Sequence, residues 1–184
     1  GPVFSDVVAV SLAPRFSGSF SRFGAPGVRL HRASDLTLAQ AIVSESEALK
    51  VPVAALTADE LNQYGITGER DHGVLVPLYY LEEAGVTCPL VWIGMSLLPP
   101  EEIYAFGVAV QRAAEKVGKR VAFLASGDLS HRLTRDAPAG YQPEGARFDR
   151  MLVDKVRDGD LEGLLRIDPA LADKAGECGW RSFM

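Results

Sequence analysis

Side chains that can do chemistry gather in a few short stretches of this 184-residue chain, which holds only three histidines. The most informative stretch is S-G-D-L-S-H at 126–131, where Asp128 and His131 stand three residues apart. A carboxylate that orients an imidazole is the usual arrangement of a general acid–base pair. The alternative is that Asp128 caps a turn while His131 is solvated. The pattern marks both residues as candidate catalytic groups.

The second histidine, His72, follows Asp71 and precedes Gly73 at the start of an apolar run. Asp71 is expected to cap a helix there by accepting a backbone N–H. The helix N-terminus would disfavour an imidazolium, and a neutral His72 can donate a hydrogen bond to a substrate oxygen or bind a metal. The alternative is a histidine that only satisfies the turn. His31 has no carboxylate nearby and is interpreted as a surface or edge histidine.

A carboxylate between two glycines, Glu177, lies in A-G-E-C-G at 175–179. The glycines let the backbone approach another part of the chain closely, and Glu177 could then serve as a metal ligand or a base. Cys178 is either a small buried hydrophobe or a reactive thiol. The lack of a basic neighbour before Arg181 favours the buried interpretation.

His72, His131 and Glu177 together would supply the two imidazoles and one carboxylate that hold non-haem iron. Such a set leaves coordination positions open for oxygen and substrate. The spacing alone is not specific for this arrangement.

The elements that must position these residues alternate between strands and helices. Short apolar, β-branched runs predict buried strands at 7–10, 51–56, 90–95 and 121–125. Helical spacing or helix-start signals predict helices at 36–50, 74–84, from Pro99 to Gly118, and at 146–157, 161–167 and 169–174. The glycines and prolines of 13–27 argue against a regular element there; the three phenylalanines in it either pack the loop onto a core or wall a pocket.

This alternation predicts an α/β fold with a mixed, mostly parallel sheet and helices on both faces. Ligands of such sheets bind beyond the C-terminal ends of strands. The predicted strand at 121–125 therefore directs Asp128 and His131 toward a site. The whole chain is expected to be a single domain, 1–184.

Composition narrows the function classes. The chain has 19 Lys and Arg against 24 Asp and Glu, a net charge of -5, which argues against a general nucleic-acid binder. No apolar run approaches the roughly 20 residues of a membrane helix. Two cysteines make neither a disulfide framework nor a four-cysteine zinc site. With no secretory signal visible, a cytoplasmic location is expected.

Six motifs make the chain resemble the class III extradiol ring-cleavage dioxygenase superfamily, catalytic-subunit type, and within it the Memo-like branch of AmmeMemoRadiSam system proteins. They run in order through nearly the whole sequence: G-P-V-F-S-D at 1–6, R-F-S-G-S-F-S-R-F-G-A-P at 15–26, D-H-G-V-L-V-P-L-Y-Y-L at 71–81, A-S-G-D-L-S-H-R-L at 125–133, D-A-P-A-G-Y at 136–141 and A-G-E-C-G-W-R-S at 175–182.

The resemblance implies a ferrous site with two histidines and a glutamate. The family's ligand histidines come early, one in a His-Pro motif and one just before the Gly-Pro that matches residues 1–2, and neither is present here. Only the carboxylate ligand carries over, onto Glu177. By the same resemblance His131 would be the acid–base group, His72 would contact substrate oxygens, and Asp128 would orient His131.

The implied activity is Fe(II)-dependent cleavage of a catechol-type ring with O2, and a homo-oligomer is possible. The alternatives are a Memo-like, metal-linked accessory protein of a radical-SAM system without ring cleavage, and an α/β fragment with no activity as supplied. Because the chain begins at Gly1-Pro2 and stops at Met184, we expect N-terminal strands and a C-terminal helix to be missing. The 184 residues alone are expected to be inactive and to bind iron poorly.

Overall fold

The computed structural model describes residues 2–66, 68, 71–137 and 139–184, and separates the chain into two units, Gly1–Ala122 and Phe123–Met184. The first unit combines strands with helices, and the second is built from helices. The predicted α/β class is confirmed.

The strands of the first unit form short ladders. β1 (Val3–Phe4) pairs in parallel with β6 (Met95–Ser96), and β2 (Val8–Ser11) pairs in parallel with β5 (Val53–Leu56). On its other side β2 meets residues 92–94, where the Ser11 N–H donates to the Trp92 carbonyl at 3.0 Å. The predicted strand at 90–95 thus becomes an irregular neighbour of β2, and only its last residue enters β6.

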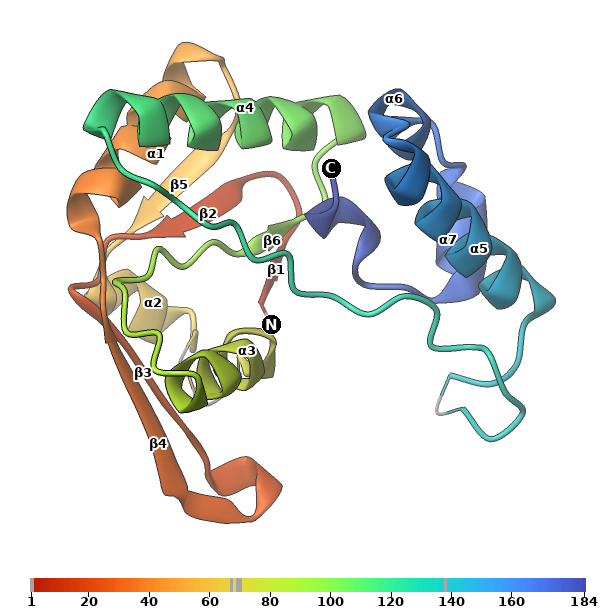
Figure 1. The fold of residues 1–184 in the computed structure, drawn as a ribbon, viewed down its shortest axis with the longest axis horizontal. Helices are drawn as coiled ribbons and strands as arrows, with labels where there is room; N and C mark the ends of the chain where they lie inside the picture. The colour runs from red at the N-terminus through yellow and green to blue at the C-terminus, as the bar shows by residue number, and fades with distance from the viewer. Residues whose placement is uncertain (1, 67, 69–70, 138) are drawn as a thin grey trace. The chain divides into compact units, whose positions relative to one another are not determined.

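Helices cover both faces of these strands, as predicted. On one face, Val8 and Val10 pack with α1 (Leu36–Ala48) and α4 (Pro100–Val117), which lie side by side (Figure 1). On the other, Ala9 packs with side chains of α2 (Ala58–Gln63) and α3 (His72–Glu83). Successive residues of a strand point to opposite faces, so one apolar run, 8–10, serves both layers.

The segment at 13–27, expected to be irregular, forms a regular hairpin instead. β3 (Arg15–Phe20) and β4 (Ala25–Ala33) pair antiparallel around a 3-10 turn, η1 (Ser21–Phe23). In a two-stranded ribbon both strands are edges, so the proline in β4 removes no essential ladder bond. Gly24 supplies the left-handed turn, with φ +80°. Phe16 and Phe20 pack onto the core, whereas Phe23 is 60% exposed.

The strand predicted at 121–125 is not formed. A strand exists only where a neighbour completes its backbone hydrogen bonds, and none of the described residues pairs with this segment. Val121, Phe123 and Leu124 are each more than 40% exposed. The expectation that a sheet strand presents Asp128 and His131 was wrong for this structure.

Helices α5 (Pro143–Asp158), α6 (Leu161–Leu165) and α7 (Pro169–Ala175), with the 3-10 turn η3 (Trp180–Ser182), enclose the core of the second unit. Trp180 is 1% exposed, and its indole Nε1 donates to the Leu164 carbonyl at 2.9 Å. Phe148 and Leu152 of α5 pack in the same core. Because α7 and η3 are fixed in this core, the connecting residues 176–179 are held at both ends.

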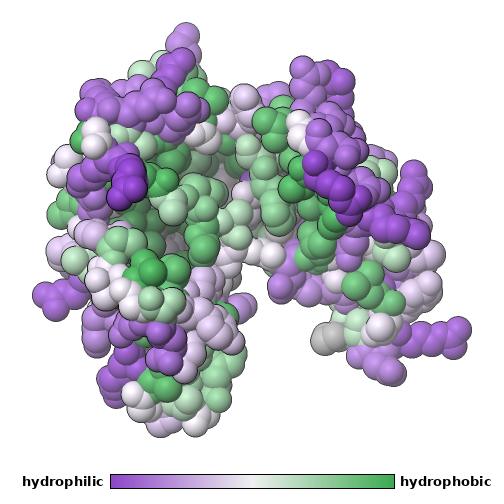
Figure 2. Space-filling model, viewed as in Figure 1, coloured by the Kyte–Doolittle hydropathy of each residue, from purple (hydrophilic) through white to green (hydrophobic). Residues whose placement is uncertain are grey.

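No helix among the described residues combines the length and the apolar character needed to cross a membrane. On the face of the first unit shown in Figure 2, hydrophobic and hydrophilic residues are mixed over the β3–β4 hairpin.

Candidate active site in the second unit

Two glycine-containing segments of the second unit lie against each other and build the site. A Cβ added to Gly127 would lie 2.4 Å from Cα of Gly179, and one on Gly179 would lie 2.8 Å from the Asp128 carbonyl oxygen. The Cys178 N–H donates to that same carbonyl at 3.1 Å. The close backbone approach predicted for the glycines around Glu177 is present, and it brings the S-G-D-L-S-H segment to residues 176–179.

His131 binds an acceptor with each ring nitrogen. Nδ1 lies 2.5 Å from the Gly176 carbonyl oxygen, and Nε2 lies 3.2 Å from Oδ2 of Asp128. Both partners favour the protonated ring, so the Gly176 carbonyl first and the Asp128 carboxylate second raise the pKa of His131 above its ordinary value. The direct Asp128–His131 hydrogen bond that the spacing allows is therefore formed, although the His131 side chain is 42% exposed.

Cys178 contradicts the buried interpretation because it is exposed. Its Sγ accepts the Asp128 N–H at 3.3 Å, and one potential ligand atom from each of Asp128, His131 and Cys178 lies within 4.8 Å of the others. The sequence missed this proximity because Cys178 stands 50 residues from Asp128 along the chain.

Glu177 is half-buried, and its Oε2 accepts the N–H of Trp180, the first residue of η3, at 2.7 Å. Its charge also contributes, as the last of several causes, to the raised pKa of His131. The role predicted for Glu177, a metal ligand, stays a prediction.

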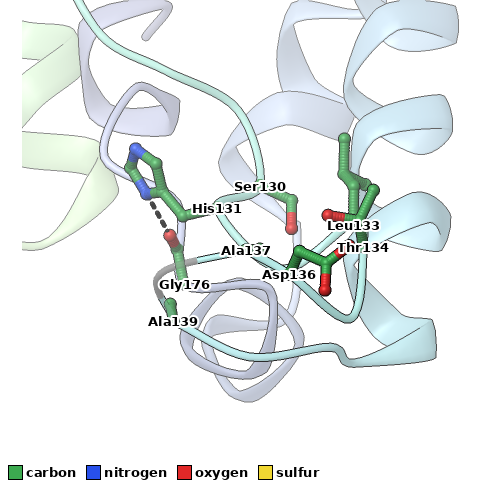
Figure 3. A pocket seen from close by; sticks show the side chains of 8 residues that line it. All are labelled: Ser130, His131, Leu133, Thr134, Asp136, Ala137, Ala139 and Gly176. Atoms are coloured by element: carbon green, nitrogen blue, oxygen red, sulfur yellow. Dashed lines mark hydrogen bonds between the residues drawn. The ribbon is translucent and has the colours of Figure 1, made fainter.

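A pocket of about 660 Å³ opens beside His131. Figure 3 shows the His131 ring turned toward Gly176, with the carboxylate of Asp136 standing apart from it across the pocket. The lining residues are Ser130, His131, Leu133, Thr134, Asp136, Ala137, Ala139 and Gly176. The walls thus combine apolar side chains with two hydroxyls, one imidazole and one carboxylate. Asp136 was not singled out from the sequence.

The other two histidines belong to the first unit. His72 is exposed at the first residue of α3, and its ring meets Phe23 edge-on at 6.2 Å. Asp71 does not cap α3 with its side chain; its buried carboxylate accepts the Trp92 Nε1–H at 2.7 Å instead. His31 is exposed on β4, with Nδ1 3.1 Å from Oγ of Ser17. The role predicted for His72 at a substrate stays a prediction.

The donors of the second unit do not fit the two-histidine, one-carboxylate iron set. His131 is its only histidine, and both ring nitrogens are already bound to oxygen acceptors. One oxygen of Glu177 is likewise engaged by the Trp180 N–H. Among the described residues of this unit, His131 is a group that can transfer a proton beside the pocket.

Comparisons with known proteins relate the chain to a protein family and to a curated protein. The family described as the catalytic LigB subunit of aromatic ring-opening dioxygenase matches residues 3–184. Protein CA_C1420 of Clostridium acetobutylicum is 37% identical over 182 residues, which are 99% of this chain and 39% of that protein. The chain thus spans about two-fifths of this curated relative. Enzymes of the matched family are generally metal-dependent and act on an aromatic substrate with O2. Since the match runs through both units, the chain belongs to the family of the catalytic LigB subunit of aromatic ring-opening dioxygenases.

Proposed function

We propose that this chain is the proton-handling part of an Fe(II)-dependent extradiol dioxygenase that cleaves a catechol-type ring. The observation that carries the proposal is His131, held between the Gly176 carbonyl and Asp128 and lining a pocket of small-molecule size. The family match through both units supports treating residues 1–184 as parts of one catalytic domain. In the overall reaction, one C–C bond of the ring breaks beside the diol, and both atoms of one O2 enter the product.

His131 is the general base in this proposal. With Nδ1–H donated to the Gly176 carbonyl, neutral His131 carries its lone pair on Nε2, where it can accept a phenolic proton. Asp128 and the Gly176 carbonyl then stabilise the imidazolium. Because these partners raise the pKa of His131, the base is stronger than a free imidazole, but it is protonated over a wider range of acidic pH. We expect kcat/KM to rise with pH as His131 loses its proton.

Iron would supply the binding of O2 and of the two catechol oxygens. Glu177 is proposed as its carboxylate ligand. The two imidazoles of the set would come from outside the second unit, because His131, the one histidine of that unit, serves as the base in this proposal. His72 is proposed to contact a substrate oxygen.

The test uses the full-length protein, loaded anaerobically with Fe(II) and given a panel of catechols in an oxygen electrode. We expect oxygen uptake with at least one catechol. His131→Ala should abolish turnover while iron content stays near that of the unmodified protein. His31→Ala is the matched control and should keep its activity, since His31 lies on an exposed hairpin.

Glu177→Ala should lower iron affinity, with Glu162→Ala as the control. Glu162 is an exposed carboxylate of the same unit that pairs with Arg166 at 2.7 Å. Unchanged iron affinity of Glu177→Ala would reject the ligand role. Loss of iron in His131→Ala would reject the acid–base role. An iron-loaded protein without oxygen uptake on any catechol would favour the alternative, a Memo-like accessory protein.

The charge of the pocket wall predicts which catechols react best. Asp136 and His131 are the only titratable residues among its lining residues. A carboxylated catechol would bring a second negative charge near Asp136, whereas a neutral or amino-substituted one would not. We expect Asp136→Lys to shift the kcat/KM ratio toward carboxylated catechols, and Asp173→Lys, on exposed α7 surface, to leave that ratio unchanged. An unaltered ratio in Asp136→Lys would show that the substrate does not face this wall.

A further inference from the structure

Ser130, the residue before His131, is a junction of three hydrogen bonds. Its N–H donates to Oδ1 of Asp149 at 2.8 Å, and its Oγ donates to the Ala175 carbonyl at 2.8 Å. The same Oγ accepts the Arg132 N–H at 3.0 Å. These bonds tie the S-G-D-L-S-H segment to α5 through Asp149 and to the last residue of α7 through Ala175.

The packing around Ser130 leaves room for this junction and for little else. Gly145 is buried in the first turn of α5. A Cβ added there would lie 2.4 Å from Ser130 Oγ and 3.3 Å from the Arg132 carbonyl oxygen. Any larger residue at position 145 would displace the serine, so α5 can approach the segment only where it has no side chain.

The junction fixes the place of the His131 ring. Ser130 binds the Ala175 carbonyl, while Nδ1 of His131 binds the next carbonyl, that of Gly176. The His131 N–H also points to the Gly176 oxygen, at 3.4 Å. Two consecutive residues are thus matched to two consecutive carbonyls at the end of α7. A shift of Ser130 would carry the imidazole away from its acceptor.

We infer that Ser130 and Asp149 are positioning residues that hold the His131 imidazole against the Gly176 carbonyl. Asp149 holds the backbone N–H of Ser130. The Ser130 hydroxyl, by binding the Ala175 carbonyl, keeps His131 aligned with the Gly176 carbonyl. Neither touches the reacting atoms. The inference rests on the proposed role of His131 as the acid–base group, but the ring placement that it concerns exists in the resting protein.

Four variants test this inference. Asp149→Ala removes the acceptor of the Ser130 N–H, whereas Asp149→Asn keeps an acceptor oxygen at the same place. Ser130→Ala removes both Oγ hydrogen bonds without adding bulk. Asp154→Ala is the matched control, because Asp154 is an exposed carboxylate on the same helix that pairs with Arg157 at 2.8 Å.

The readout is the long-range ¹H–¹⁵N NMR spectrum of the imidazoles in the resting protein. The chain has three histidines, so His31 and His72 serve as internal references. We expect Asp149→Ala and Ser130→Ala to shift the His131 ring nitrogens toward the positions of a solvated imidazole. Asp149→Asn and Asp154→Ala should leave them in place, and the His31 and His72 signals should not move in any variant.

Unmoved His131 signals in both Asp149→Ala and Ser130→Ala would overturn the inference, and so would an equal shift in Asp154→Ala. Should Asp149→Ala fail to fold, Ser130→Ala and Asp149→Asn still decide the question. In the full-length, iron-loaded protein, kcat should fall about 10-fold or more in Ser130→Ala with little change in KM. If the NMR shifts occur as expected but no variant and no wild-type protein takes up oxygen with catechols, the positioning stands and the proposed function fails.

Discussion

Adding a single methyl group at Gly127 tests whether the two segments of the site meet as closely as the structure has them. In Gly127→Ala the new Cβ would lie 2.4 Å from Cα of Gly179 and 2.9 Å from the Cys178 carbonyl oxygen. Ordinary contact begins near 3.4 Å, so one backbone must move by about 1 Å. Both contacts are backbone atoms, which cannot rotate away as a flexible side chain would.

Overpacking of this kind costs about 1–3 kcal/mol, and a backbone clash without relief belongs at the upper end, about 3 kcal/mol. Each 1.4 kcal/mol is a factor of ten, so the ratio of folded to unfolded second unit should fall by roughly two orders of magnitude. For a unit of this size, the melting temperature should drop by more than about 10 °C.

Each unit holds one buried tryptophan, Trp92 in the first and Trp180 in the second, which allows a local measurement. In a Trp92→Phe background, Trp180 emission reports unfolding of the second unit under urea or heat. Gly27→Ala is the control, because a Cβ at Gly27 meets nothing within 4 Å. A Gly127→Ala variant with the control's midpoint would refute the close approach of the two segments.

Two pH-linked predictions follow from charged hydrogen bonds. The Gly176 carbonyl, and after it Asp128, raise the pKa of His131. The stability that its imidazolium contributes is therefore full below the ordinary pKa of about 6.5 and is lost as pH rises through the raised value. An NMR titration should give Asp128→Asn a lower His131 pKa, and an identical value would contradict the contact. The hydrogen bond from Lys119, and after it a backbone N–H, lower the pKa of Asp35, the N-cap of α1, so its contribution is present above the ordinary carboxyl pKa and is lost as pH falls through the lowered value. Asp35→Ala should cost the first unit about 1 kcal/mol at neutral pH, seen as an earlier urea midpoint of Trp92 emission. Lys119→Ala should cost less, because the Lys119 side chain is 45% exposed and solvent screens its charge. Equal losses would show that the ion pair, and not the cap, stabilises the helix.

Local signals in the sequence predicted the helices well. Pro100 with its acidic neighbours begins α4, and Gly118, in the left-handed conformation, ends it. The apolar run at 7–10 forms β2 because its two faces are both covered, by α1 and α4 on one side and by α2 and α3 on the other. The capping box formed by Thr57 and Glu60 is a further local signal, and it begins α2.

Local patterns in the sequence do not show which distant segments pair in a sheet. Whether 121–125 becomes a strand depends on a neighbour that completes its ladder, and the apolar pattern of Phe123 and Leu124 carries no information about that neighbour. The β3–β4 hairpin is the opposite case. Its glycines and proline argue against a strand, yet a ladder forms, because both strands are edge strands and tolerate these residues.

The candidate site was predicted where its residues are close along the chain and missed where they are not. Asp128 and His131 are three residues apart, and this short spacing predicted that they could form a hydrogen bond. Asp149 meets Ser130 across 19 residues, and Cys178 meets Asp128 across 50. Those contacts depend on how α5 and α7 pack, which no local pattern specifies.

The most direct test of the central claim follows the oxygen atoms. The full-length, Fe(II)-loaded protein is given a catechol under ¹⁸O₂. The ring-opened product is reduced at once with borohydride, so that its aldehyde cannot exchange with water, and its mass is then measured by mass spectrometry. We predict a product that carries two labelled oxygens, formed by His31→Ala and not by His131→Ala. Catechol recovered intact from the iron-loaded protein, or a ring-opened product formed equally well by His131→Ala, would contradict the account.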